Sequence, residues 1–490
     1  LNVGNLSTTT AGTSNLRLGV NAGNSIASGG DKNVVVGDEA GTAITTGDQN
    51  TFVGYAAGDA TTTSSNNTGI GNNALGGNIL GSYNVAIGKD SLEEMNPATA
   101  VNMYNTAVGA AAGQKVTTGV QNTIIGALAG DALTDSGPVV AVGYEALSTE
   151  DRDGGGTTAI GYQALKTQNA GATAYNTAVG WNAGLSVTTG VDNTLIGGLA
   201  GDALTDADNN VAVGRSALGS DTLGSRSTAV GRGALGAQNF TTATDSNNTA
   251  VGYTAGNSVT TGTNNSFLGA AAGLNVTTGI NNTLIGSLAG DALTDADENV
   301  AVGFAALGVD TLGSKSTAIG RSALVSQNFT TATDSFNTAI GHSAGLSITT
   351  GVQNTLIGYQ ALTTDTLGSK STAVGVGALA NQNFTTATDS ANTAVGFSAG
   401  GNVTTGINNT LIGFEAGDKL TDADQNVAIG RRALYSSTLG GKSIAIGTNA
   451  LHNSNHTTAT DALNVAIGFQ AGNFHTTGTL NVLIGADAGL

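Results

Sequence analysis

Acidic turns with the pattern Asp-x-Asp-x-Asn contain the residues of this 490-residue sequence that are best suited to binding an ion. Carboxylate and amide oxygens are the ligands that Ca²⁺ prefers in proteins. The turns lack the glycine and the distal glutamate of an EF-hand loop, so a turn closed by hydrogen bonds from its own Asp and Asn side chains is the alternative interpretation. No cofactor other than this Ca²⁺ is expected. The candidate calcium ligands are Asp206, Asp208, Asp295, Asp297, Asp422 and Asp424.

Large side chains recur at a second kind of position, directly after a glycine that itself follows Val, Ile or Leu. Aromatic rings stack on sugars, so this column could bind carbohydrate, or the same amphipathic side chains could fill an interface between chains. The mixture of aromatic and basic residues favours the interface, because water is excluded from only some of the coils along such a contact. The candidate interface residues are Tyr55, Tyr144, Tyr162, Trp181, Tyr253, Phe304, Tyr359, Phe397, Phe414, Phe469, Arg215, Arg232, Arg321 and Arg431, and the same position holds Lys89 and His342.

Catalytic residues do not form a recurring pattern. The four histidines, His342, His452, His456 and His475, lie in variable turn positions without a repeated Asp or Ser partner. A Ser-His-Asp arrangement assembles in space rather than in sequence, but a repetitive chain without a unique polar insertion offers it no place. The chain has no cysteine, which excludes disulfides and thiolate metal sites. We therefore expect that the chain is not an enzyme.

The composition argues against a globular domain. Glycine contributes 75 residues and proline 2, aromatic residues make up 4% and charged residues 10%, well below the roughly 25% charged residues of ordinary soluble domains. Glycine lacks the every-third-residue spacing of collagen. The net charge of −18 repels the phosphates of nucleic acid and argues against it as a partner, and no apolar run approaches the roughly 20 residues of a membrane span. Stacked β-coils remain the class that fits.

A short phrase ending in the recurrent glycine repeats along the whole chain, which indicates a repeat architecture. Successive glycines are mostly 17 residues apart and in five cases 21, and the other spacings all occur before Gly180. We predict an all-β, parallel β-solenoid or β-roll of about 27 coils, forming one shaft domain over residues 1–490. Residues 1–180 contain the less regular coils and residues 181–490 the regular ones. At roughly 4.8 Å for each coil, the rod would be on the order of 130 Å long.

Residue types within a coil predict its core. The Val or Ile before the glycine is expected to point inward with its neighbours outward, because side chains alternate along a strand. Alanine recurs three residues after the glycine, and an apolar residue seven after it, as at Val259 and Leu293. Such a core is too thin for one coil to be stable, so stacking and association of chains must supply the rest.

Polar residues also keep fixed positions. Asparagine precedes most strands, which predicts ladders of side-chain amides and turn-forming roles. Basic residues lie five before the glycine and are expected to face Asp-rich turns such as those of Asp202, Asp206 and Asp208, or to form a solvated polar face. These basic residues are Arg226, Lys315, Lys370 and Lys442. Each precedes a 21-residue coil with the phrase Gln-Asn-Phe-Thr-Thr-Ala-Thr-Asp, at 238–245, 327–334 and 382–389, with an echo at 453–461.

The repeat resembles two groups of known fibres. Asn-Thr-Ala-Val-Gly at 248–252, Asn-Val-Ala-Ile-Gly at 464–468 and Ser-Ile-Ala-Ile-Gly at 443–447 resemble the coil motif of trimeric autotransporter adhesin heads. Asn-Thr-Leu-Ile-Gly-Tyr-Gln-Ala-Leu at 354–362, together with Thr-Thr-Gly, is similar to repeats of phage and marine-bacterial tail-fibre proteins. The resemblance implies left-handed β-rolls from three chains packed side by side in a homotrimeric rod. The 17-residue period is longer than the adhesin coil.

The resemblance implies a structural function. The first hypothesis is the shaft of a phage tail fibre on the virion, which binds other fibre or tail proteins and holds a receptor-binding tip, outside this chain, toward a host glycan or receptor. The second is a trimeric adhesin or filament subunit on the bacterial cell surface. A third is a fibre whose glycan-degrading domain lies outside this chain. None of the three requires nucleic acid or membrane insertion.

Overall fold

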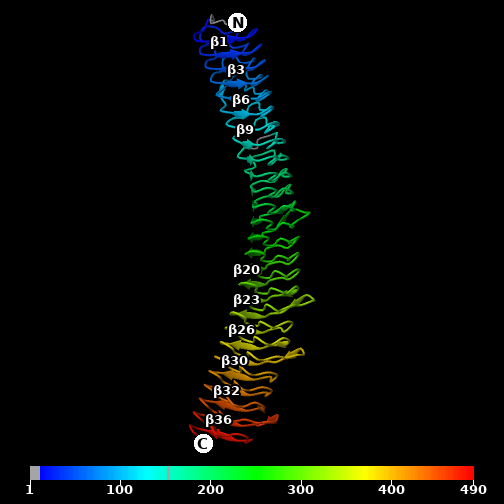
Figure 1. Cartoon of the computed structure of the whole chain (residues 1–490), viewed down its shortest axis with the longest axis vertical. Coiled ribbons are helices and arrows are strands. Elements are labelled where there is room, and N and C mark those ends of the chain that lie inside the picture. Colours follow the sequence, from blue (N-terminus) through cyan, green and yellow to red (C-terminus); the bar gives the residue numbers. More distant parts are fainter. Residues whose placement is uncertain (1–10, 152–154) are drawn as a thin grey trace, which may run out of the picture. The chain divides into compact units, whose positions relative to one another are not determined.

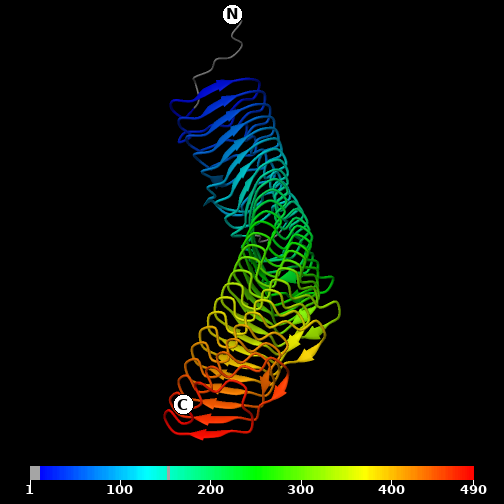
Figure 2. The same cartoon turned by 60° about the horizontal axis from the view of Figure 1, so that its bottom comes forward.

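The computed structural model describes residues 11–151 and 155–490, which contain β-strands and turns and no helix. The chain divides into two compact units, residues 1–247 and 248–490, and each is described by itself. In both units the chain winds through successive coils that stack on one another (Figures 1 and 2). Since the described residues include no helix, none provides a helical membrane span.

Each coil contributes one strand of three residues to a parallel sheet. In the first unit these strands are β1 (Leu16–Leu18), β2 (Val34–Val36), β3 (Thr51–Val53), β4 (Thr68–Ile70), β6 (Val85–Ile87), β8 (Thr106–Val108), β9 (Thr123–Ile125), β10 (Val140–Val142), β11 (Thr158–Ile160), β12 (Thr177–Val179), β13 (Thr194–Ile196), β14 (Val211–Val213) and β16 (Thr228–Val230).

In the second unit they are β18 (Thr249–Val251), β19 (Ser266–Leu268), β20 (Thr283–Ile285), β21 (Val300–Val302), β23 (Thr317–Ile319), β25 (Thr338–Ile340), β26 (Thr355–Ile357), β28 (Thr372–Val374), β30 (Thr393–Val395), β31 (Thr410–Ile412), β32 (Val427–Ile429), β34 (Ile444–Ile446), β36 (Val465–Ile467) and β37 (Val482–Ile484). Within each unit, every strand pairs in parallel with the strand of the next coil, as β12 does with β13. The predicted parallel β-solenoid of about 27 coils is therefore confirmed; its assembly into a homotrimer stays a prediction.

The register of the sheet brings equivalent residues of successive coils side by side. Thr177 pairs with Thr194, and Val179 with Ile196, so each sequence position forms a column along the stack. Successive residues of one column are separated by the distance between parallel strands, roughly 4.8 Å. The repeated spacing in the sequence therefore becomes a repeated spacing in space.

The side-chain direction predicted for the strands is wrong. The middle residue of the strand points inward and the Val or Ile before the glycine points outward: in β25, Ala339 is fully buried whereas Ile340 is 38% exposed. The buried asparagine that precedes the strand, such as Asn337, sets the phase, because residues two apart in a strand share a face. The alternation was correct, but alternation alone does not say which set faces the interior.

The remaining core positions follow the prediction. The alanine three residues after the glycine is buried in coil after coil, as at Ala255, Ala272 and Ala289. The apolar residue seven after the glycine is buried as well, which holds for Val187, Val259, Val276, Leu293 and Ile348. Small side chains dominate the interior because opposite walls of a coil lie close together.

Buried asparagines link each coil to the next, which confirms the predicted amide ladder. Asn282 Oδ1 accepts the backbone N–H of Asn299 at 3.0 Å, and Asn282 Nδ2 donates to the carbonyl of Ala296 at 2.7 Å. The same pair of bonds recurs where Asn precedes a strand, for example at Asn193 and Asn409. The side chain thereby satisfies backbone groups of the turn and of the neighbouring coil, which could not remain unpaired in the core.

The glycine that ends each strand allows the coils to approach. Gly286 has φ of 129°, and a Cβ on it would lie 2.6 Å from the carbonyl oxygen of Gly303 in the next coil. A side chain there would meet backbone, which cannot move aside, in a conformation that L residues rarely adopt. The glycine column is therefore a steric requirement of the stack.

The 21-residue coils add a second, shorter ladder. Two-residue strands pair in parallel between a coil and the long coil after it: β5 (Gly81–Ser82) with β7 (Val101–Asn102), β15 (Gly224–Ser225) with β17 (Thr244–Asp245), β22 (Gly313–Ser314) with β24 (Thr333–Asp334), β27 (Gly368–Ser369) with β29 (Thr388–Asp389), and β33 (Gly440–Gly441) with β35 (Thr460–Asp461). The longer coils thus contain an additional segment that is hydrogen-bonded to the preceding coil. We call this segment, which contains β7, β17, β24, β29 or β35, the long-coil ledge.

Replacing a ladder asparagine by alanine should destabilise the fold. In Asn282→Ala the N–H of Asn299 and the carbonyl of Ala296 lose their partner in the core. We expect the free energy of unfolding to fall by about 1–3 kcal/mol, measured by denaturant titration. Thr261→Ala, at an exposed turn position, is the control and should change it by less than about 0.5 kcal/mol. Equal effects of the two variants would contradict a structural role of the ladder.

Candidate functional site

The outward side of the three-residue strands is the most unusual surface of the chain. We call it the strand face and define it as the first and third residues of these strands. Every one of these positions holds Leu, Val, Ile, Thr or Ser, and none carries a charge. Away from the ends of the two units, its most exposed residues include Ile70, Ile87, Ile125, Ile160, Ile196, Leu268, Ile319, Ile340, Ile357, Val395, Ile412 and Ile467.

The strand face is continuous within each unit. Neighbouring strands pair in register, so Ile340 of β25 lies beside Ile357 of β26, and Thr338 lies beside Thr355. The third residues of the strands form a continuous row of Val, Ile and Leu from coil to coil, and continuous exposed apolar patches mark interaction surfaces. The geometry therefore suits contact with another apolar surface. Sequence reasoning missed this face, although the lack of charge at both positions in every described coil was a usable signal.

The column after the glycine lies beside the strand face, separated from it by that glycine alone. Its aromatic members are exposed, from Phe414 at 41% to Trp181 and Tyr253 at 55%. The basic candidates Arg215, Arg232, Arg321 and Arg431 are exposed as well. All the predicted interface candidates thus lie on the surface of one chain, next to the strand face, and their role as contacts between chains stays a prediction.

Members of this column stack on one another within the chain. The rings of Tyr144 and Tyr162 lie 5.6 Å apart and nearly parallel, and Trp181 continues the stack at 6.4 Å from Tyr162. The pairs Phe397–Phe414 and His342–Tyr359 stack in the same way. Stacking covers one face of each ring in a pair, and Tyr162 has stacking partners on both sides. Because sugars stack on ring faces, this geometry disfavours a carbohydrate site at these levels.

Arginines of the column lie over aromatic rings of the adjacent coil. The guanidinium of Arg321 lies 5.8 Å from the ring of Phe304, and that of Arg431 lies 5.8 Å from the ring of Phe414. Cation–π contacts at exposed sites contribute about 0.5–1 kcal/mol. The alternation of aromatic and basic residues is thus explained partly by contacts within one chain, which a sequence without register does not reveal.

The basic residues five before the glycine lie against the acidic turns, as the N–H of Lys315 donates to the carbonyl of Asp297, but their side chains pair with other aspartates than predicted. Lys315 pairs with Asp334 at 2.6 Å and Arg226 with Asp245 at 2.7 Å, and Lys370 and Lys442 repeat the arrangement. The partner is the last Asp of the long-coil phrase, not an Asp of the acidic turns. The ladder of short strands decides this, because it places Ser314 beside Asp334, next to Lys315. These pairs are exposed and contribute little singly.

The candidate calcium ligands hold neighbouring coils together. Asp208 Oδ1 accepts the N–H of Val191, and Asp297 Oδ1 and Asp424 Oδ1 accept those of Ile280 and Ile407, each at 2.8 Å. The other members, Asp206, Asp295 and Asp422, accept the hydroxyls of Thr189, Thr278 and Thr405. In the part of the chain that the structure describes, no group of three or more His, Asp and Glu side chains is arranged to hold a metal.

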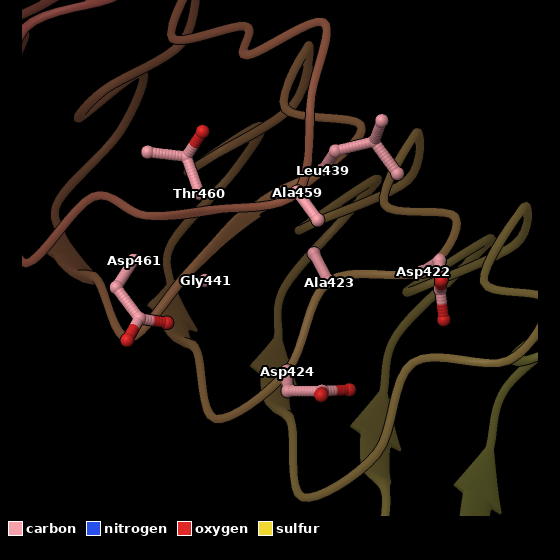
Figure 3. A pocket seen from close by; sticks show the side chains of 8 residues that line it. All are labelled: Asp422, Ala423, Asp424, Leu439, Gly441, Ala459, Thr460 and Asp461. Carbon is pink, nitrogen blue, oxygen red and sulfur yellow. The ribbon is translucent and has the colours of Figure 1, made fainter.

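A hollow lies beneath the last long-coil ledge (Figure 3). Its volume is about 410 Å³, and it is lined by Asp422, Ala423, Asp424, Leu439, Gly441, Ala459, Thr460 and Asp461. At the matching position of other coils a serine hydroxyl accepts a backbone N–H of an acidic turn: Ser225 accepts that of Asp208, and Ser314 that of Asp297. Gly441 provides no hydroxyl, so the N–H of Asp424 lacks this acceptor beside the hollow.

Introducing a serine at that position should stabilise the ledge. The hydroxyl that Gly441→Ser adds would accept the N–H of Asp424, as Ser314 accepts that of Asp297 at 2.9 Å, and the side chain would reduce the freedom of the unfolded chain. A Cβ on Gly441 would lie 3.0 Å from the carbonyl oxygen of Asp424, a tight contact that offsets part of the gain, so Gly441→Ser is expected to raise the free energy of unfolding by about 0.5 kcal/mol, measured by denaturant titration. Gly441→Ala is the control without a hydroxyl. If it stabilises as much as Gly441→Ser, the proposed hydrogen bond is absent.

A column of half-buried aspartates lies five residues after the glycine. Burial is the largest cause that raises the pKa of each carboxyl above its usual range, and for Asp418 the charge of Glu415 adds to it. The members are Asp59, Asp131, Asp202, Asp291 and Asp418. A raised folded-state pKa favours the protonated form, so these groups support the fold most below the unfolded pKa of about 3.9 and lose that contribution as pH rises through the folded pKa.

Asp291→Asn combined with Asp202→Asn should remove part of this pH dependence. At pH 7 the variant is expected to be more stable than the parent chain, because two partly desolvated charges are gone. The advantage should shrink as the pH falls through the raised folded-state pKa of the two carboxyls, because they then become protonated in the folded parent chain. Denaturation midpoints at several pH values provide the measurement. A stability difference that does not change with pH would contradict the assignment.

The histidines do not form a common site among the described residues. His342 stacks on Tyr359, and His452 stacks on Tyr435. His475 contacts Asn481 through its Nε2, and His456 is buried beneath the last ledge.

Neither a family model nor a curated protein sequence matches the chain.

Proposed function

We propose that this chain forms the shaft of an extracellular fibre, a phage tail fibre on the virion, in which three copies associate side by side through their strand faces. The observation that carries the proposal is the continuous, uncharged strand face. Covering such a surface with a second apolar surface removes its apolar side chains from water, which is favourable in free energy. The shaft holds a receptor-binding tip, which lies outside this chain, toward a host surface.

The coil geometry supports packing of identical copies. Columns repeat at the same spacing in every copy, so residues of one level meet residues of the same level in a parallel neighbour, with Thr and Val or Ile alternating across the contact. The aromatic column borders this contact and would form its amphipathic rim. The net charge of −18 resides on the turns and keeps assembled fibres apart in solution.

The location of the fibre can be tested on the virion or cell that carries the protein. Antibodies against the exposed long-coil ledges would label appendages of a virion if the tail-fibre proposal holds. Labelling of the bacterial cell surface would instead support the alternative, a trimeric adhesin or filament subunit. Glycan receptors and other fibre proteins would then be sought at the ends of the appendage, since stacking within this chain already covers one face of each paired ring.

A charge on the strand face should dissociate the assembly. Ile340→Lys combined with Ile357→Lys places two ammonium groups at adjacent levels of the strip, where a dry contact would have to desolvate them. Sedimentation equilibrium is expected to show three times the chain mass for the parent protein and the chain mass for the variant. Thr331→Lys, on an exposed long-coil ledge, is the control and should stay trimeric. A monomeric parent chain would refute the proposed association.

A further inference from the structure

Three of the long coils share a buried arrangement around an aspartate of the preceding coil. Asp310 accepts the N–H of Gly313 and of Phe329, each at 3.1 Å, and the amide of Gln327 at 2.6 Å. The same three bonds hold Asp221 and Asp365. All three aspartates are fully buried. Each of these sites therefore holds one anionic group with two backbone N–H donors and a side-chain donor.

The last long coil keeps the backbone and changes the side chains. Gly440 pairs with Thr460 in the register in which Gly313 pairs with Thr333, so the two ledges have the same ladder. Ser437 stands where the other sites have Asp, Ser454 where they have Gln, and His456 where they have Phe. The carboxylate is thus removed together with the two side chains that surround it.

The new side chains occupy the places of the old ones. A Cβ on Gly440 would lie 3.0 Å from Ser437 Oγ and 2.7 Å from His456 Cδ2. On Gly313 a Cβ would lie 2.1 Å from Asp310 Oδ2 and 2.7 Å from Phe329 Cδ2. The serine and the imidazole therefore face the same point beside the ladder, but the serine is too short to carry an acceptor to the backbone donors.

Buried donors converge on this point. Ser437 is 1% exposed and His456 4% exposed, and among the described residues Ser437 Oγ and His456 Nε2 have no hydrogen-bond partner. The bonds that the N–H groups of Gly313 and Phe329 donate to a carboxylate have no counterpart from Gly440 and His456 in the described chain. Buried polar groups are almost always satisfied, so two unpartnered side chains that lie beside the backbone of Gly440 indicate an occupant.

We propose that Ser437, His456 and the backbone N–H groups of Gly440 and His456 bind a small monovalent anion, of the class of chloride, in the place that an aspartate carboxylate occupies in three of the other long coils. The surroundings supply donors: two amides, a hydroxyl and an imidazole N–H, assigned to the ring nitrogen that faces the anion. Acceptor-only occupants fit such a set, as the three carboxylates show.

Other occupants fit less well. A cation would need several oxygen or nitrogen acceptors, and in the described residues no group of three His, Asp or Glu side chains is placed to hold a metal. Lys442 is already bound to Asp461, and burial, followed by the charge of His475, lowers the pKa of His456. A water molecule is the remaining occupant, and the experiment separates it from the anion.

Chloride binding can be measured on the full chain by the linewidth of its ³⁵Cl NMR signal. The parent protein is expected to broaden the signal, and bromide should reverse the broadening by competition. Ser437→Asp, which supplies the carboxylate from the chain itself, should abolish the excess linewidth. Ser436→Asp is the matched control: it adds the same charge at a neighbouring, half-buried position and should leave the excess linewidth unchanged.

A second variant guards against misfolding of Ser437→Asp. The triple change Ser437→Asp, Ser454→Gln and His456→Phe copies the site of Asp310, and should fold and lose chloride binding. Bromide-soaked crystals of the parent protein should show anomalous density between Ser437 and Gly440. Density without an anomalous signal there would identify water and overturn the proposal. Equal ³⁵Cl broadening by the parent and the triple variant would also overturn it.

Discussion

Hydrogen bonds from buried asparagine side chains to the next coil are the interaction on which the stack depends. A coil of 17 residues has too few large apolar side chains to order itself, so its backbone must be satisfied by its neighbours. Asn282 does this in both directions, because its Oδ1 and Nδ2 bind different segments of the chain. The ladder also sets the phase of the strand and thereby decides which side chains reach the interior.

The same phase makes the surface of the strands apolar. With Asn337 and Ala339 turned inward, Thr338 and Ile340 have no alternative but to face outward. The interior takes up the middle residue of the strand, an alanine and the apolar residue seven after the glycine, so the Val or Ile at the third strand position is left where a second copy could cover it. The thin core and the uncharged strand face are therefore two consequences of one geometric constraint, and they explain why association of chains is part of the proposed function.

Repetition also lets one part of the chain serve as the comparison for another. The sites of Asp221, Asp310 and Asp365 show what the backbone of a long coil holds when the sequence is regular. Departures from that pattern at Gly441 and Ser437 lie in the same pair of coils, and each coincides with a local feature: a hollow in one case, a set of buried donors in the other. Specific features in such a chain arise by substitution within a fixed frame.

The sequence by itself determined the coil number, the one-strand-per-coil parallel stack, the glycine and asparagine columns and the buried alanines, because each depends on spacing along the chain. Tertiary structure alone decided the direction of Ile340 and its equivalents, the pairing of Lys315 with Asp334 and the stacking of Tyr144, Tyr162 and Trp181. These depend on which faces of neighbouring coils meet. Periodicity specifies that side chains alternate, whereas only the closed coil, with its asparagine inside, specifies which of them the interior accepts.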